Sequence, residues 1–188
     1  TRLPSLESYT FLDLGCGKGR ALLVASEFSF ENILGIELSP LLAEIARHNA
    51  EIVAHRFPQR TEVCIQVADA SSFPLPAGNL VIFLYHPFGA ELVAKVVAGI
   101  EAALAAEDRS IYIVYYNPVA GHCFDASPLL QRYFAGMIPY GTEEIGYGPD
   151  ETDPLVIWQG GTATSPPIAS ANAQIVVGKN GGRVTLVT

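Results

Sequence analysis

Short apolar runs alternate with stretches of helical periodicity along the first two thirds of the chain. Apolar or alternating runs predict strands at residues 9–13, 32–38, 61–67, 80–85 and 110–116. Between them, apolar residues recur every three or four positions and predict helices at about 18–28, from 40 to before Pro58, and at about 90–105. Such alternation predicts an α/β fold, a doubly wound and mostly parallel sheet that binds ligands at the carboxyl ends of its strands.

This rhythm changes after residue 118. The pattern predicts a short helix at 127–134, then strands at 137–146 and 155–159 that form an antiparallel pair at the edge of the sheet. A segment rich in Gly, Thr, Ser, Ala and Pro, 160–172, indicates a loop, and Asn180-Gly181 predicts the turn of a terminal β-hairpin. We therefore expect one domain over residues 1–160 and an extension, 161–188, that packs on the domain or trails from it.

Composition narrows the class of protein. The 188 residues are 49% hydrophobic and 16% charged, which is typical of a compact globular domain. A net charge of −8 argues against a nucleic-acid partner and favours a small molecule or a basic protein. No apolar run approaches the length of a membrane span. Three cysteines without metal-binding spacing predict a reduced, cytoplasmic protein without a metal site.

A glycine-rich turn joins the first strand to the first helix. Asp13-Leu14-Gly15-Cys16-Gly17-Lys18-Gly19 follows the strand, and its three glycines allow backbone amides to approach a ligand closely. A dinucleotide fingerprint, G-x-G-x-x-G, would place its third glycine at position 20, where Arg20 stands. A nicotinamide or flavin enzyme therefore stays only an alternative.

Two further acids follow the next two strands. Glu37 ends the second strand just before the helix start Ser39-Pro40, and a carboxylate there suits two ribose hydroxyls. Asp69 follows the third strand. Each acid, like Asp13, also has a plain structural reading as a turn, cap or strand-end residue.

The order of these motifs over residues 9–118 resembles the class I S-adenosylmethionine (SAM)-dependent methyltransferases. The resemblance implies a Rossmann-like sheet of the seven-stranded type and transfer of a methyl group from SAM. It assigns the methionine end of SAM to Asp13 and the glycine turn, the ribose to Glu37, and the adenine to Asp69 and Ala70. The positions expected to bind the cofactor are Asp13, Gly15, Cys16, Gly17, Gly19, Glu37, Leu38, Asp69 and Ala70.

The segment after the fourth strand, Tyr85-His86-Pro87-Phe88-Gly89, is similar to the N/D-P-P-Y/F motif of amino-group methyltransferases. Tyr85 stands where that motif has Asn or Asp, which puts an adenine-type acceptor in doubt. We expect His86, which titrates near neutral pH, and Tyr85 to be the catalytic candidates. Phe88 and Asn117 are expected in the acceptor pocket, although His86 also suits a structural place under the rim and Phe88 one as a plug of the cleft.

The sequence does not identify the methyl acceptor. A small molecule and a protein side chain both stay open, and a weaker likeness, carried by Asp13-Leu14-Gly15 and Phe88-Gly89, extends to the non-SET histone-lysine methyltransferases. A protein that binds SAM or a partner without catalysis is a further alternative. The helical segment that precedes the glycine turn in this family is expected to be missing, and the oligomeric state stays open.

Overall fold

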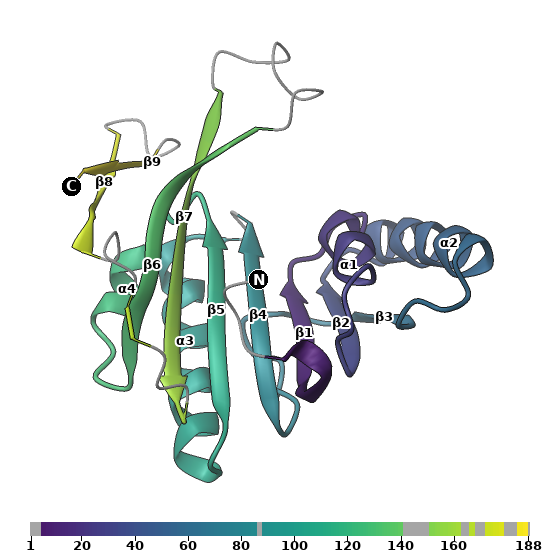
Figure 1. Ribbon diagram of the computed structural model, residues 1–188, viewed down its shortest axis with the longest axis horizontal. Coiled ribbons are helices and arrows are strands. Elements are labelled where there is room, and N and C mark those ends of the chain that lie inside the picture. Colours follow the sequence, from purple (N-terminus) through teal and green to yellow (C-terminus); the bar gives the residue numbers. More distant parts are fainter. Residues whose placement is uncertain are drawn as a thin grey trace.

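The computed structural model describes residues 5–85, 88–140, 151–162, 166–167, 172–178 and 184–187. Seven strands form one sheet in the order β3-β2-β1-β4-β5-β7-β6 (Figure 1). The strands are β1 Tyr9–Leu14, β2 Asn32–Glu37, β3 Val63–Val67, β4 Asn79–Tyr85, β5 Ser110–Tyr116, β6 Leu130–Pro139 and β7 Thr152–Gly161. Neighbours among β1 to β5 pair in parallel, and β7 lies antiparallel to both β5 and β6.

Helices cover the two faces of this sheet unevenly. The helices α1 Arg20–Ala25 and α2 Pro40–Arg56 pack over β1 to β3, whereas α3 Ala90–Ala106 and α4 Gly121–Asp125 lie on the opposite face (Figure 1). A single 3₁₀ turn, η1 Leu6–Ser8, precedes β1. No helix in the described part of the chain is long and apolar enough to cross a membrane.

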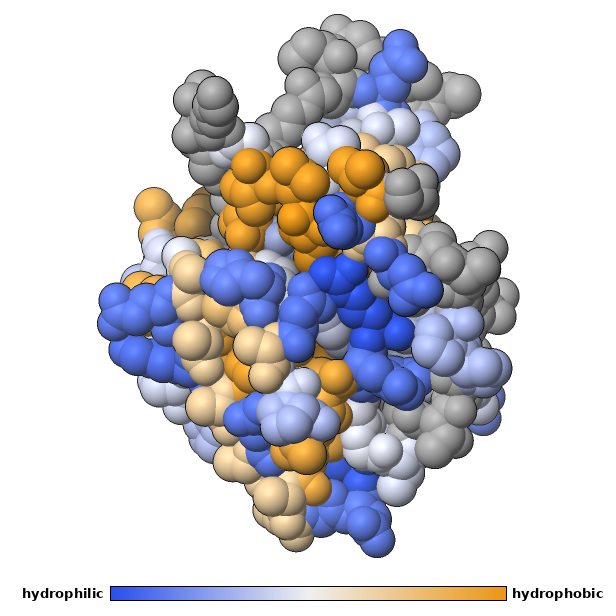
Figure 2. Space-filling view, turned by 90° about the vertical axis from the view of Figure 1, so that its left-hand side faces the viewer, coloured by the Kyte–Doolittle hydropathy of each residue, from blue (hydrophilic) through white to orange (hydrophobic). Residues whose placement is uncertain are grey.

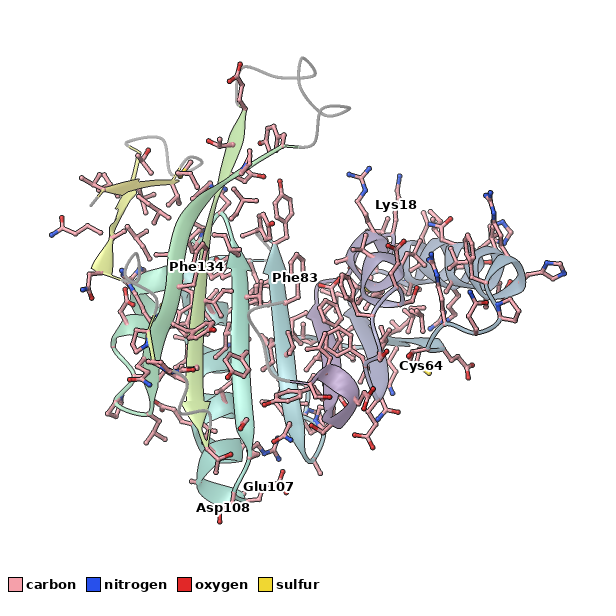
Figure 3. The ribbon with its side chains drawn as sticks, viewed as in Figure 1. Lys18, Cys64, Phe83, Glu107, Asp108 and Phe134 are labelled. Carbon is pink, nitrogen blue, oxygen red and sulfur yellow. The ribbon has the colours of Figure 1, made fainter. Side chains whose placement is uncertain are left out.

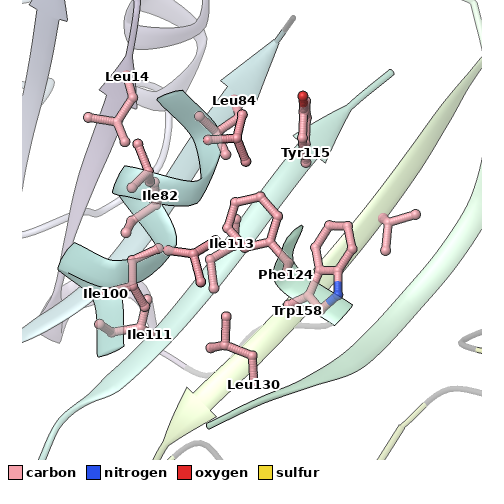
Figure 4. Close-up of a cluster of buried hydrophobic side chains, with 14 of the residues drawn as sticks. Leu14, Ile82, Leu84, Ile100, Ile111, Ile113, Tyr115, Phe124, Leu130 and Trp158 are labelled. Atoms are coloured by element: carbon pink, nitrogen blue, oxygen red, sulfur yellow. The ribbon is translucent and has the colours of Figure 1, made fainter. Parts of the chain in front are cut away.

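Two hydrophobic clusters hold the layers together. The larger one lies between the sheet and α3 and α4, where Phe124 and Trp158 pack with ring centroids 5.1 Å apart (Figure 4). The smaller one lies on the α1 face and includes Phe11, Leu22 and Tyr112. Because β4 and β5 bury side chains on both faces, they have the near-continuous apolar sequences of central parallel strands.

The predicted fold class is confirmed, including the antiparallel pair at the edge. The predicted helix at 127–134 is wrong, since Leu130 begins β6 and the short helix α4 lies earlier, at Gly121–Asp125. A register shift in the β6–β7 ladder between Arg132 and Phe134 explains the error. Because of this shift, the consecutive residues Tyr133 and Phe134 both pack in the smaller hydrophobic cluster. The sequence therefore lacks the alternation of apolar and polar residues that would predict a strand. The predicted strand 137–146 is correct only up to Pro139, and its residues 141–146 lie outside the described ones.

The predicted terminal hairpin is present as an antiparallel pair of β8 Gln174–Val177 and β9 Val184–Val187, which forms a separate two-stranded sheet. Its predicted turn at Asn180-Gly181 lies outside the described residues. Val184 is 2% exposed, and a Cβ atom on Gly121 of α4 would lie 2.6 Å from Ile175 Cδ1. Hydrophobic residues gather on the face that carries the hairpin (Figure 2).

Polar contacts also join this region to the sheet. Arg132 forms a bidentate ion pair with Asp125 and donates to the carbonyl oxygen of Ala173, just before β8. The indole Nε1 of Trp158 donates to Asp125 Oδ1 at 2.9 Å. One carboxylate of α4 therefore links β6, β7 and, through Arg132, the residue that leads into β8.

Candidate functional site

The glycine turn is held against the end of β2 by its backbone. The amides of Gly15 and Cys16 donate to the carbonyl oxygen of Ile36 at 2.9 and 3.0 Å. Gly17 and Gly19 have φ angles of 55° and 81°, a left-handed conformation that side-chain-bearing residues rarely adopt. A Cβ atom on Gly17 would meet nothing within 4 Å, so the outer side of this turn is open to a ligand.

A glycine in β2 allows the turn to sit this close to the sheet. A Cβ atom on Gly35 would collide with Leu22 and lie 2.8 Å from Cys16 Sγ. Burial is the main cause that raises the pKa of the Cys16 thiol to about 12, with the nearby Asp13 and Glu37 carboxylates adding to it. Cys16 is therefore no nucleophile, and its contribution to the site is its backbone.

Glu37 connects the glycine turn to the start of α2. Its Oε2 accepts a hydrogen bond of 2.8 Å from the Gly17 amide, and its Oε1 accepts one of 2.8 Å from the Ser39 amide. The residue is only 9% exposed. Since a carboxylate offers about four lone-pair sites, Glu37 keeps acceptor capacity for ligand hydroxyls.

Asp13 lies beneath the same turn and is 4% exposed. Burial, and to a smaller extent the Glu37 carboxylate, raise the pKa of Asp13 to about 7. Asp13 is therefore partly protonated at neutral pH. A positively charged ligand group next to it would favour the ionised form.

Asp69 follows the end of β3 near Glu37, because the preceding residue, Ala68, donates its amide to the Glu37 carbonyl oxygen at 3.1 Å. Its Oδ1 accepts hydrogen bonds from the Ser71 amide at 2.9 Å and from Ser71 Oγ at 2.8 Å. These bonds hold the pKa of Asp69 below its usual range. Asp69 thus has the hydrogen bonds of a turn residue, as its structural interpretation predicts, and its side chain is exposed. Leu38, at 68% exposure, offers an apolar surface beside it.

The residues expected to meet the acceptor lie at the ends of β4 and β5. Tyr85 is 57% exposed, and its ring centroid lies 6.2 Å from that of Tyr116. His86 lies outside the described residues. Phe88 packs against the hydrophobic cluster beneath α3, and Asn117 has a φ of 48° with its amide donating to the Pro154 carbonyl oxygen at 2.8 Å.

The sequence analysis did not identify two charged residues that act on Tyr85, Arg20 and Asp153. Burial and the charge of Asp153 raise the pKa of Tyr85, and the charge of Arg20 opposes them. Arg20 begins the helix after the glycine turn, and its place where a dinucleotide-binding protein has glycine was the available signal. Nothing in the local pattern marked Asp153, which reaches this edge only because β7 returns antiparallel to β5.

The structure thus brings Asp13, the glycine turn, Glu37 and Asp69 together at the carboxyl ends of β1, β2 and β3. Lys18 of the same turn projects from this edge in Figure 3, and its carbonyl oxygen accepts a bond of 3.0 Å from Asn49 of α2. Open backbone at Gly17, a nearly buried carboxylate at Glu37 and an exposed Leu38 offer a ligand amide donors, a hydrogen-bond acceptor and an apolar surface.

Comparison with known proteins agrees with this geometry. Residues 12–86 match the family model described as a methyltransferase domain. No curated protein matches the chain in sequence. The match runs from within β1 to just past the end of β4 and therefore contains every residue expected to bind the cofactor.

Solved structures extend the likeness to the whole sheet. The chain is 16% identical to a putative methyltransferase from Pseudomonas syringae, with 84% of this chain and 90% of that one covered and a TM-score of 0.56. It is 15% identical to an RNA methyltransferase from Salinibacter ruber in complex with S-adenosyl-L-homocysteine (88% and 90% covered, TM-score 0.54). A magnesium protoporphyrin IX methyltransferase from Synechocystis with bound SAM is 10% identical (84% and 71% covered, TM-score 0.54).

Proposed function

We propose that this chain, a SAM-dependent methyltransferase of the class I fold, methylates an acceptor held at the carboxyl ends of β4 and β5. SAM is the cofactor of this enzyme class, and the motifs at the ends of β1 to β3 are its expected site. The observation that carries the proposal is the Glu37 carboxylate, which is nearly buried and bonded to both Gly17 and Ser39 at the end of β2.

We assign a part of the cofactor to each motif. Asp13 and the amides of the turn from Gly15 to Gly19 would hold the methionine end, and Glu37 would accept the ribose hydroxyls. Leu38, Asp69 and Ala70 would contact the adenine, with Asp69 still offering its Oδ2 atom. When bound, SAM supplies a methyl group on a positively charged sulfur, which a nucleophilic acceptor atom takes in one displacement.

The acceptor side needs alignment more than acid–base chemistry, because the methyl donor is already activated. Tyr85 stays protonated at neutral pH, since its pKa is raised above the ordinary value of tyrosine. We therefore propose that its hydroxyl orients the acceptor as a hydrogen-bonding group. His86, Phe88 and Asn117 stay candidates for proton removal and for the pocket wall.

A protein lysine is the second candidate acceptor, and a small molecule is the first. The net charge of −8 favours a basic protein over a nucleic acid among macromolecules. We also propose a reducing compartment, the cytoplasm, for which the three free cysteines are the support.

Thermal unfolding with S-adenosylhomocysteine tests the cofactor site. At a hundred times its dissociation constant, a ligand adds about 2.7 kcal/mol of stability. For a chain of this size we expect a rise in Tm of roughly 5–10 °C. Each hydrogen bond to the Glu37 carboxylate is worth about 1.5–3 kcal/mol, so Glu37→Ala should weaken binding at least tenfold.

The matched control is Glu44→Ala, an exposed acid on the second turn of α2. Each variant is compared with its own ligand-free Tm, so that a loss of stability in Glu37→Ala does not count as a loss of binding. No ligand-induced rise in the unsubstituted chain, or an equal rise in Glu37→Ala, would contradict the assigned site.

A further inference from the structure

A row of aromatic rings crosses the sheet and ends at the acceptor edge. Ring centroids lie 6.0 Å apart for Phe11 and Phe83, 5.9 Å for Phe83 and Tyr116, and 6.2 Å for Tyr116 and Tyr85. The row passes from β1 through β4 to β5, on the face that carries α1. Figure 3 shows Phe83 on β4, and Tyr85, two residues further, points to the same face of this strand.

The row ends at an exposed ring. Tyr85 is 57% exposed, and Phe83 and Tyr116 are half-buried. In the described part of the chain, α1 and α2 lie over β1 to β3, and α3 and α4 lie on the opposite face (Figure 1). On the face that carries α1, no described helix therefore covers the ends of β4 and β5. Rings in this arrangement offer both faces and edges to another planar ring.

Charged residues also lie at this edge of the sheet. Arg20 begins α1 just after the glycine turn that follows β1, the neighbour of β4, and Asp153 belongs to β7, the neighbour of β5. Both charges act on the pKa of Tyr85, which Asp153 raises and Arg20 lowers. Arg20 and Lys18 are both exposed, and neither forms an ion pair with another described residue. Lys18 belongs to the turn proposed for the methionine end of SAM. Arg20, which forms no ion pair with another described residue, is therefore the cation that can attract an anionic group of the acceptor.

We propose that the acceptor is a planar aromatic compound with an acidic substituent. Its ring packs against Tyr85 and Tyr116, and its acidic group faces Arg20. A ring hydroxyl is the methyl acceptor: its oxygen bonds to the methyl carbon as the bond from that carbon to the sulfur of SAM breaks. S-adenosylhomocysteine leaves, and the hydroxyl proton passes to water or to the Asp153 carboxylate. This inference rests on the proposed function, because it takes the glycine turn as the cofactor side of the pocket.

A matched set of acceptors separates ring shape from charge. The probes are 4-hydroxybenzoate and 6-hydroxy-2-naphthoate, their neutral amides, 4-hydroxybenzylamine as the cationic analogue, and 4-hydroxycyclohexanecarboxylate as the non-planar one. Formation of S-adenosylhomocysteine from SAM gives kcat and KM for each. Because a hydrogen bond to a charged group is stronger than one to a neutral group, we expect KM to be about tenfold lower for each acid than for its amide. We expect the cationic and non-planar probes to be the poorest.

Variants identify the groups responsible. Arg20→Gln should remove the preference for acid over amide by raising KM for the acids with kcat kept. Arg56→Gln, an exposed arginine at the end of α2, should leave it unchanged. Tyr85→Ala should raise KM for both aromatic sets, whereas Tyr85→Phe should keep most of the ring contact.

The outcomes distinguish the two proposals. A preference for acidic aromatic probes that depends on Arg20 supports the inference. Stabilisation by S-adenosylhomocysteine without turnover of either acid, or with better turnover of the amine, overturns the inference and leaves the cofactor assignment intact. No stabilisation by S-adenosylhomocysteine contradicts both.

Discussion

At the scale of single residues, the pair of Asp13 and Glu37 is the most constrained feature of the site. Glu37 has amide donors for both of its oxygens, while Asp13 is buried beside it with its pKa raised to about 7. An ionised acid in this position is disfavoured by lost hydration and by the neighbouring carboxylate. Asp13 therefore lowers the stability of the ligand-free protein at neutral pH.

The pH dependence of stability tests this cost. Because the folded-state pKa of Asp13 is above its unfolded value of 3.8, its ionisation removes stability as the pH rises from about 4 to 7. Asp13→Asn should therefore gain stability relative to the unsubstituted chain over this range, by up to about 4 kcal/mol above pH 7. Urea unfolding at pH 4.5, 6 and 8 measures the difference, and a difference independent of pH would contradict the prediction.

At the scale of elements, two glycines within a strand and a helix differ in the space around them, and we expect their replacement by alanine to change stability in opposite directions. Gly35 of β2 faces Leu22 and Cys16, which leave no room for a side chain, whereas Gly99 of α3 has nothing within 4 Å of its Cβ position. Gly35→Ala should lower the free energy of unfolding by about 1–3 kcal/mol through overpacking. Gly99→Ala should raise it by about 0.5–1 kcal/mol, since alanine favours the helix.

Denaturant unfolding of the two variants checks this contrast. Gly35→Ala should also reduce the Tm rise with S-adenosylhomocysteine, because the displaced side chains support the glycine turn. Equal effects of the two substitutions on stability would mean that the turn does not depend on close contact with β2.

The sequence predicted well those elements that follow one another as alternating strands and helices. Strands β1 to β5 and the helices between them follow from periodicity and from the Ser39 cap, which accepts a bond from the Leu42 amide. The first part of β6, residues 130–136, was not predicted as strand, because its pairing with β7 and its irregularity between Arg132 and Phe134 depend on a segment more than twenty residues away.

The residues of the candidate site likewise divide into those that local sequence predicts and those that it does not. Asp13, Glu37 and Asp69 follow consecutive strands, so a linear reading finds all three. Asp153 lies far along the chain and approaches Tyr85 only through the antiparallel return of β7. A charged residue that reaches the site only through the tertiary fold cannot be recognised from the periodicity of the sequence.

At the scale of the whole molecule, the terminal hairpin packs onto the sheet. Val184 is 2% exposed and Val187 is 49% exposed, although both belong to β9. Val184→Ala should cost about 1–3 kcal/mol of unfolding free energy, because it leaves a small cavity. Val187→Ala should change it by less than about 0.5 kcal/mol. Equal, negligible effects in urea unfolding would indicate that residues 161–188 form an appendage to the domain.

The position of β7 between β5 and β6 has a consequence for the chain as it is synthesised. The outer edge of β5 is complete at Tyr116, but its partner ends only at Gly161. At about 5–20 residues per second, a ribosome needs roughly 2–9 s to supply that partner. During this interval a central strand carries a row of unpaired backbone groups, the kind of edge on which nascent chains aggregate. Slow translation between these two strands would therefore lower the yield of folded protein more than slow translation before β5.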